Sequence, residues 1–165
     1  MELNTGPYHI RTGVEQMDIG EIHRFLSMES YWAKGISFEM VKESLRYSYC
    51  VGMFLEDSQI GFARLITDYT TFAYLADVFV MEPYRGKGLS KRLMQHIMDL
   101  DVVMRCRRVL LATKDAHSLY NQFGFTAPGH PQTFMETRKK DGYGTGPGAC
   151  PPVGVHKGDI QGNNG

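Results

Sequence analysis

The chain has 165 residues with 18 basic and 18 acidic side chains, so its formal net charge is zero, and 42% of it is hydrophobic. This balance predicts one soluble domain with a sizeable core and argues against a nucleic-acid or anionic-membrane partner, because such binding draws on excess Lys and Arg. There is no leader pattern at Met1 and no apolar run near the roughly 20 residues of a membrane span, so we expect a cytoplasmic protein.

Apolar runs and turn signals predict, in chain order, a strand, two helices, three strands, a longer helix and a last strand. They lie at residues 8–12, 19–28, 38–47, 49–55, 59–67, 72–80, 89–100 and 109–112. The three middle strands follow one another through polar turns, which favours antiparallel pairing. The helix that follows them makes a βαβ crossover, which sets the last strand parallel to the strand before the helix. The predicted fold class is α/β (α+β), with a mixed, mostly antiparallel central sheet flanked by helices.

Two polar residues precede the first helices at positions that suit a helix cap. Asp18 can accept the free N–H groups of the first helix, and Ser37 those of the second. The second helix carries three apolar residues on one side, namely Phe38, Val41 and Leu45.

Cysteine and histidine spacing argues against disulfides and metals. The three cysteines, Cys50, Cys106 and Cys150, are far apart and odd in number, which indicates free thiols. The six histidines lack the spacing that zinc requires, and a Cys150–His156 site is only a weak exception, so we expect no metal. Residues 141–165 hold eight glycines and three prolines. They predict a flexible tail after a domain of residues 1–140.

The stretch from Asp77 to Leu100 predicts an anion site. An apolar strand ends in a proline turn, and a glycine loop then leads directly into an amphipathic helix. The loop and the helix start consist of Arg85, Gly86, Lys87, Gly88, Leu89 and Ser90. The glycines allow close approach of the main chain, while the helix start offers unpaired N–H donors and a dipole worth roughly half a positive charge. We therefore expect a ligand that carries phosphates.

Two other phosphate motifs do not fit this loop. A Walker-type loop needs Gly, four residues and Gly-Lys-Ser/Thr, and a dinucleotide fingerprint needs a third glycine where Lys91 stands. Taken alone, the segment also leaves open a simple strand-to-helix turn whose glycines serve steric needs.

The run from Val78 to Ser90 resembles the acetyl-CoA signature of the GNAT superfamily of N-acetyltransferases. Arg85, Gly88 and Ser90 occupy its three defining positions, although Ser90 stands where Gly or Ala is usual. A second stretch, residues 116–125, follows at the expected distance and is similar to the family's "A..LY..FGF" segment. Together the two motifs are much more specific than either alone, and the resemblance covers nearly all of the foldable chain.

The resemblance implies the acyl-CoA N-acyltransferase fold and acetyl-CoA as cosubstrate. The acetyl group would pass to a primary amine of a small molecule or to an exposed amino group, by direct attack in a ternary complex. Residues 85–90 would bind the CoA pyrophosphate, and the main chain at Phe79 and Val80 would pair with the pantetheine arm. Tyr120 matches the tyrosine that assists the departing sulfur, although a buried core tyrosine is the alternative. Thr113 stands where many members carry an asparagine that contacts CoA.

Attack on a thioester requires a neutral amine, and a group of pKa about 10.4 is less than about one part in a thousand neutral at pH 7. We therefore expect a general base. Asp77 is the first candidate because the family often places an acid on this strand, while a structural carboxylate is an equal alternative. Asp68, Glu82 and His117 are fallbacks.

In the family, the loop between the first two helices covers the acceptor site. Tyr31, Trp32 and Phe38 are therefore candidate substrate walls, although they could equally fill an edge of the core. We leave a homodimer open. The alternative function is a non-catalytic acyl-CoA-binding or protein-interaction module on the same fold.

Overall fold

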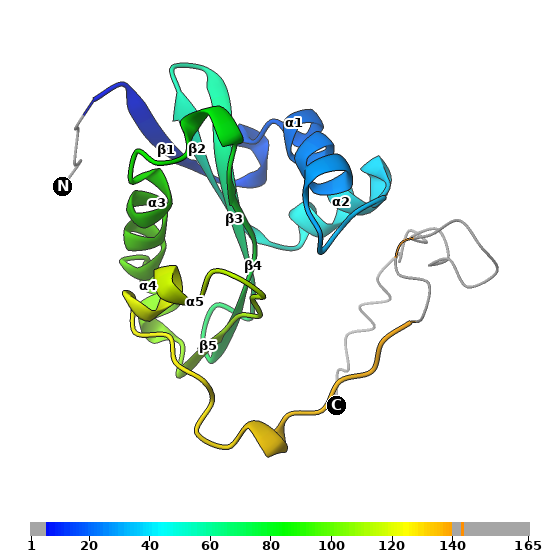
Figure 1. Cartoon of the computed structure of the whole chain (residues 1–165), viewed down its shortest axis with the longest axis vertical. Helices are drawn as coiled ribbons and strands as arrows, with labels where there is room; N and C mark the ends of the chain where they lie inside the picture. The colour runs from blue at the N-terminus through cyan, green and yellow to red at the C-terminus, as the bar shows by residue number, and fades with distance from the viewer. Residues whose placement is uncertain (1–5, 140–142, 144–165) are drawn as a thin grey trace, which may run out of the picture.

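A five-stranded sheet in the order β1-β2-β3-β4-β5 forms the centre of the computed structural model, which describes residues 6–139 and residue 143 (Figure 1). Its strands are β1 (Tyr8–Thr12), β2 (Tyr49–Leu55), β3 (Ser58–Thr67), β4 (Phe72–Val80) and β5 (Arg108–Leu110). β1 to β4 pair antiparallel with their neighbours, and β5 pairs parallel to β4. The mixed sheet is thus confirmed. Apart from Tyr143, the predicted tail at 141–165 lies outside the described residues, as do Cys150 and His156.

Helices cover both faces of the sheet (Figure 1). On one side lie α1 (Ile19–Arg24) and α2 (Phe38–Arg46), and on the other lie α3 (Leu89–Met98), α4 (Asp101–Arg105) and α5 (His117–Asn121). Single 3₁₀ turns occur at Val14–Gln16, Glu82–Tyr84 and Pro131–Thr133.

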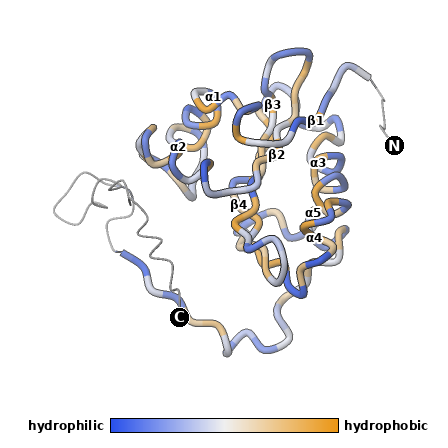
Figure 2. The backbone as a smooth tube through the Cα atoms, turned by 180° about the vertical axis from the view of Figure 1, so that it is seen from behind, coloured by the Kyte–Doolittle hydropathy of each residue, from blue (hydrophilic) through white to orange (hydrophobic). Residues whose placement is uncertain are grey.

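Each face of the sheet has its own apolar core, and the hydrophobic colour in Figure 2 follows the strands and the helices that cover them. On the α3 side the buried residues include Val51, Leu65, Leu75, Leu89, Leu93 and Ile97. On the α1 side they include Ile22, Phe25, Val41, Leu45, Phe62 and Phe79. Because the sheet is sandwiched between two buried layers, both faces of its central strands are apolar, and this fixes the position of the loops at the strand ends.

The predicted helix caps are confirmed. Asp18 accepts a hydrogen bond from the N–H of Glu21 at 3.0 Å, and Ser37 accepts one from the N–H of Met40 at 3.3 Å. On α2, Val41 and Leu45 are fully buried, as predicted. Phe38 is 41% exposed, because it lies in the first turn of the helix.

Two helices are shorter than predicted. The first stops at Arg24 and continues as a π-helical turn, Phe25–Glu29. The hydroxyls of Ser27, within this turn, and of Ser30, its C-cap, donate to main-chain carbonyls. Such bonds loosen the regular i to i−4 pattern, which the apolar spacing of residues 19–28 does not reveal. The helix predicted to reach residue 100 ends at Met98, because Leu100 has an extended backbone and is the N-cap of α4.

A β-bulge in β4 shapes the region of interest. Phe62 lies opposite Phe79, but Arg64 lies opposite Ala76, so β4 has one extra residue at this point. Asp77 lies within the bulge with a positive φ of 54°. Bulges of this kind bend a strand and redirect its side chains.

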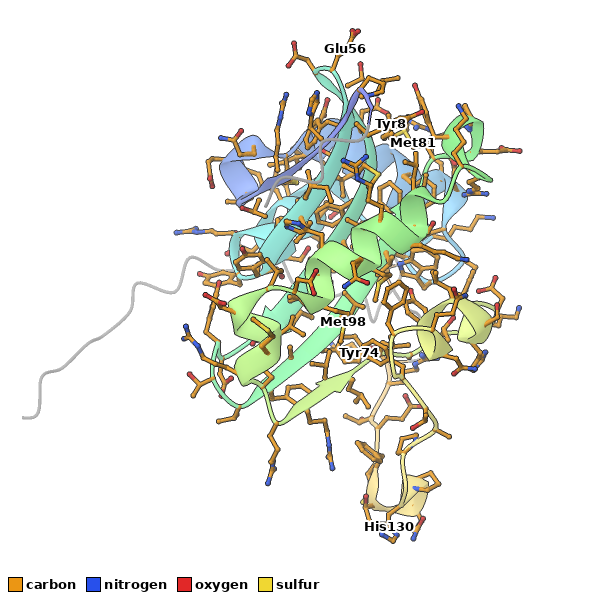
Figure 3. The ribbon with its side chains drawn as sticks, turned by 90° about the vertical axis from the view of Figure 1, so that its left-hand side faces the viewer. Tyr8, Glu56, Tyr74, Met81, Met98 and His130 are labelled. Carbon is orange, nitrogen blue, oxygen red and sulfur yellow. The ribbon has the colours of Figure 1, made fainter. Side chains whose placement is uncertain are left out.

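β5 pairs with only the first part of β4. Within the described residues the pairing ends at Tyr74 with Leu110, so the β4 edge from Leu75 to Val80 has no strand partner on that side. Figure 3 labels Tyr74 at this last pairing and Met81 just past the end of the open edge. β5 also stops two residues before the predicted Ala112, because the two strands diverge here.

Candidate active site

The glycine loop leaves its main chain open to a ligand. Gly86 and Gly88 have φ values of 76° and 74°, and a Cβ built on either residue would meet no atom within 4 Å. Gly88 is the N-cap of α3, which receives no side-chain cap from the described residues. The first N–H groups of α3 therefore receive no side-chain cap from these residues, and the binding of an anion by them stays a prediction.

A hollow of about 290 Å³ brings the loop, the open end of β4 and α5 together. It is lined by Val80, Tyr84, Arg85, Gly86, Gly88, Leu89, Ser90, Lys91 and Leu119. Among the predicted loop residues, Lys87 does not line the hollow, and its ammonium lies 5.7 Å from the centre of the Tyr84 ring.

The end of β4 is tied to the loop by a side chain. Arg85 donates from Nε to the carbonyl of Val80 at 2.9 Å, whereas the next N–H, of Met81, donates to β3. Main-chain groups alternate in direction along a strand, so Val80 faces the open edge. The carbonyl of Phe79 faces β3, and the Phe79 ring stacks on Phe25 at 3.8 Å between centres. Its role in cosubstrate binding stays a prediction.

Tyr120 lies on α5 next to Leu119, which lines the hollow, but Tyr120 itself is not among the lining residues. It is 8% exposed and packs edge-on against Phe125 with ring centres 6.0 Å apart. Burial, with the nearby Tyr31 and Asp115 acting in the same direction, raises the pKa of its phenol to about 12. The hydroxyl therefore keeps its proton at neutral pH, where it can act as a hydrogen-bond donor.

Asp77 has both carboxylate oxygens engaged. Oδ1 accepts from the indole N–H of Trp32 at 2.8 Å, and Oδ2 accepts from Nε of Arg64 at 2.5 Å. Arg64 also donates to the hydroxyl of Ser48 at 3.1 Å. The side chains of Asp77 and Arg64 are only 8% and 15% exposed. This geometry favours the structural reading of Asp77 over the reading as a base.

The fallback bases lie in different places. Asp68 is in the turn before β4, at the opposite end of the strand from the glycine loop, and the Thr71 hydroxyl together with main-chain N–H groups holds its pKa well below the ordinary value. Glu82 begins the turn after β4, and His117 is the exposed first residue of α5. Thr113 accepts from the N–H of Ala116 at 3.0 Å and so stabilises the entry to α5.

A second hollow, of about 530 Å³, lies between the α1 side and the turn after β4. It is lined by Arg24, Glu29, Met81, Glu82, Pro83, Tyr84 and Arg85. Arg24 is already paired with Glu21 and Glu29, at 3.1 Å and 2.5 Å. Tyr84 and Arg85 line both hollows, so the same turn separates them.

The sequence pattern does not reveal the partners of Asp77. Trp32 is 45 residues away and Arg64 is 13 residues away, on the neighbouring strand. One signal was present: Arg64 is the only full charge in the apolar run 59–67, and a charge in a buried strand needs a partner. Tyr31, a second missed contact, accepts from the N–H of Lys114 at 3.1 Å.

Among the described residues, no helix is both long enough and apolar enough to cross a bilayer. In the same part of the chain, no group of three or more His, Cys, Asp or Glu side chains could hold a metal ion.

Comparison with known proteins points in one direction. The model of the Acetyltransferase (GNAT) family matches residues 45–125. A crystal structure of a GNAT-family acetyltransferase, so named provisionally, from Xanthomonas campestris pv. campestris is 45% identical. The matched region covers 82% of this chain and 95% of that chain, with a TM-score of 0.78.

More distant relatives agree with this. A Gibberella zeae protein that is provisionally named an acetyltransferase is 27% identical over 137 residues, 71% of this chain and 77% of its own length. Glucosamine-6-phosphate N-acetyltransferase from Arabidopsis thaliana is 16% identical and has a TM-score of 0.56, with 82% of this chain and 100% of that chain covered. At that identity the likeness concerns the fold alone.

Proposed function

Since this chain belongs to the GNAT family of acetyltransferases, we propose that it is an acetyl-CoA-dependent N-acetyltransferase. The acetyl group passes from the CoA thioester to a primary amine, of a small molecule or of an exposed amino group, by direct attack in a ternary complex. The observation that carries the proposal is the hollow that joins the glycine loop, the open end of β4 and α5.

The residues of this hollow fit a CoA thioester. The N–H groups at the start of α3 and the charge of Arg85 suit a pyrophosphate, because Gly86 and Gly88 leave space for it. With Nε bound to Val80, Arg85 keeps its two terminal nitrogens for an anion. Lys87 adds a second positive charge on the outer side of the loop. Metal chemistry forms no part of the proposal.

The open edge of β4 suits an extended, amide-containing arm. The carbonyl of Val80 points to the side that β5 does not cover, because the next N–H, of Met81, donates to β3. An arm lying there would satisfy peptide groups that the sheet leaves without a strand partner. Phe79 contributes the wall behind this edge, because its ring is stacked on Phe25.

Tyr120 is the proposed donor to the departing sulfur. A phenol with a pKa of about 12 is a weaker acid than a thiol of pKa about 8.5. Tyr120 is therefore better suited to stabilise the developing thiolate by a hydrogen bond than to release its proton completely.

The base that takes the proton from the amine is the open part of the proposed mechanism. Asp77 stays a candidate, but its two bound donors would have to be displaced before it could accept a proton. Glu82 and His117 lie closer to solvent, where each could pass a proton through water. Asp68 is the weakest candidate because its carboxylate is bound within the turn at the far end of β4.

Thiol release tests the proposal. The protein is mixed with acetyl-CoA and a panel of amines, and free CoA is measured with a thiol reagent while calorimetry measures CoA binding. We expect tight binding and amine-dependent thiol release. Tight binding without turnover on any amine would favour the non-catalytic acyl-CoA-binding module, and failure to bind CoA would contradict both functions.

A further inference from the structure

Asp77 has a backbone conformation that differs from the rest of its strand. Three non-glycine residues of the described chain have positive φ, and two of them, Glu56 and Tyr69, lie in turns between strands. Asp77 alone lies inside a strand. Since Asp tolerates the left-handed region better than most residues, the bulge can hold this residue at limited cost. A strained residue in an otherwise regular strand points to a specific role for its side chain.

The carboxylate of Asp77 joins two elements that the sheet alone would not connect. Arg64 on β3 holds one oxygen, and Trp32 in the loop between α1 and α2 holds the other. Removal of the carboxylate would leave the poorly exposed guanidinium of Arg64 without its charged partner. The ion pair thus gives Asp77 a fixed orientation, and this orientation determines where the Trp32 indole is held.

The loop that contains Trp32 is held at a second point. Tyr31 accepts a hydrogen bond from the N–H of Lys114, which follows β5. Of these two adjacent loop residues, Trp32 is therefore hydrogen-bonded to β4 and Tyr31 to the segment after β5. β4 and β5 have already diverged at these positions, so residues 31–32 bridge the opening between the two strands.

The two aromatic rings of this bridge are available for contact. Tyr31 is 52% exposed and Trp32 is 40% exposed, and their rings meet edge-on at 5.0 Å. The ring centre of Trp32 lies 6.4 Å from that of Phe25, and the Phe25 ring is stacked on Phe79 of β4. Rigid aromatic surfaces of this kind bind apolar or cationic organic groups at low entropic cost.

We propose that Asp77 is a positioning residue, which fixes the indole of Trp32 as the wall against which the amine acceptor lies. The inference rests on the proposed acetyl transfer and assigns to the acceptor an apolar or aromatic body beside its amino group. Arg64 holds Asp77 in place, and Tyr31 provides the second half of the wall.

Two variants break the contact from opposite sides. Asp77→Asn keeps the size and tolerates positive φ, but one carbonyl oxygen cannot serve both Trp32 and Arg64. Trp32→Phe keeps an aromatic ring and the Asp77–Arg64 pair while it removes the N–H donor. Asp57→Asn is the matched control, because Asp57 is also paired with an arginine but is 98% exposed on the far β2–β3 turn.

The kinetic readout separates positioning from base catalysis. For both variants we expect the KM for the acceptor to rise about tenfold, because roughly one hydrogen-bonded contact is lost. The KM for acetyl-CoA and the pH dependence of kcat should stay as in the wild type. Asp57→Asn should match the wild type. If Asp77→Asn showed a large fall in kcat and its pH–rate profile no longer rose toward alkaline pH, Asp77 would be the base and the inference would be overturned. Wild-type acceptor kinetics in Trp32→Phe would also overturn it.

The chain has a single tryptophan, so its fluorescence reports on Trp32 alone. In Asp77→Asn the indole should become more accessible to acrylamide and its emission should shift, whereas Asp57→Asn should leave both unchanged. Unchanged fluorescence in Asp77→Asn would refute the positioning role. This readout needs no turnover, so failure of the proposed function, seen as an inactive wild type, is distinguished from failure of the inference.

Discussion

The guanidinium of Arg85 donates from Nε to the carbonyl of Val80 at 2.9 Å and so folds the glycine loop back onto the end of β4. A lysine could keep the positive charge at this position but could not bind the carbonyl and an anion in the same planar geometry. The two residues thus couple the position of the loop to the position of the strand.

Arg85→Lys should weaken CoA binding about tenfold, since a fork of N–H donors is replaced by a point charge. Lys87→Ala is the matched control, because Lys87 does not line the hollow, and its effect should be smaller. Calorimetry with CoA measures both. Equal affinities for Arg85→Lys and the wild type would show that the fork is not used.

Tyr120→Phe should lower kcat by about 100-fold while the Kd of CoA changes less than about twofold, because the hydroxyl acts on the departing sulfur. Tyr47→Phe makes the same change on a tyrosine that is 69% exposed and should have no effect. Stopped-flow thiol release and calorimetry are the measurements. Full turnover in Tyr120→Phe would leave Tyr120 with its packing role against Phe125 only.

Gly88→Glu should abolish CoA binding, since the side chain places bulk and negative charge where the anion is expected. Gly88→Ala separates the two causes: its Cβ meets open space but must adopt a positive φ, which costs about 1–2 kcal/mol. The alanine variant should therefore lose stability while it keeps measurable CoA binding. Retained binding in the glutamate variant would place the anion elsewhere.

Alkaline pH should destabilise the fold through two buried groups. Burial raises the pKa of the Cys50 thiol from 9.0 to about 11 and that of Tyr120 from 10.0 to about 12. Between pH 9 and 12 the unfolded chain releases these protons before the folded chain does, so the free energy of unfolding falls as the pH rises. Below pH 9 this contribution is fully present.

Urea unfolding at pH 8, 9, 10 and 11 measures whether the free energy of unfolding falls as the pH rises. Cys50→Ala should flatten the decline between pH 9 and 11, because the titrating thiol is gone. Cys106→Ala, at a cysteine that is only partly buried, should leave the slope as in the wild type. A slope in Cys50→Ala equal to that of the wild type would assign the decline to other groups.

Local chemistry explains which parts of the structure were predictable. Asp18 and Ser37 cap helices within three residues of themselves, and the glycine loop carries its geometry in its own φ angles. These features depend on neighbours in sequence, so a pattern can reveal them. The π-helical turn after Arg24 and the break before α4 depend on competition between nearby hydrogen bonds, which apolar spacing does not record.

The partners of Asp77 were not predictable in the same way. The sequence shows an acid on the strand where the family resemblance implies a thioester. Whether this acid acts as a base or as a structural group depends on the side chains that face it. Trp32 reaches Asp77 only because α1 and its loop fold over β4, and Arg64 reaches it only through the bulge. Tertiary contacts across 45 residues leave no periodic signal.

The divergence of β4 and β5 also bears on solubility. A row of peptide groups without a strand partner normally invites another chain to add a strand, which leads to aggregation. Here the row opens into the hollow lined by Val80, Leu89 and Leu119, which come from β4, α3 and α5. A second polypeptide, with side chains on both faces, would collide with these helices, whereas a slender unbranched chain would not. The opening therefore exposes the backbone of β4 only to molecules that are narrow enough to enter it.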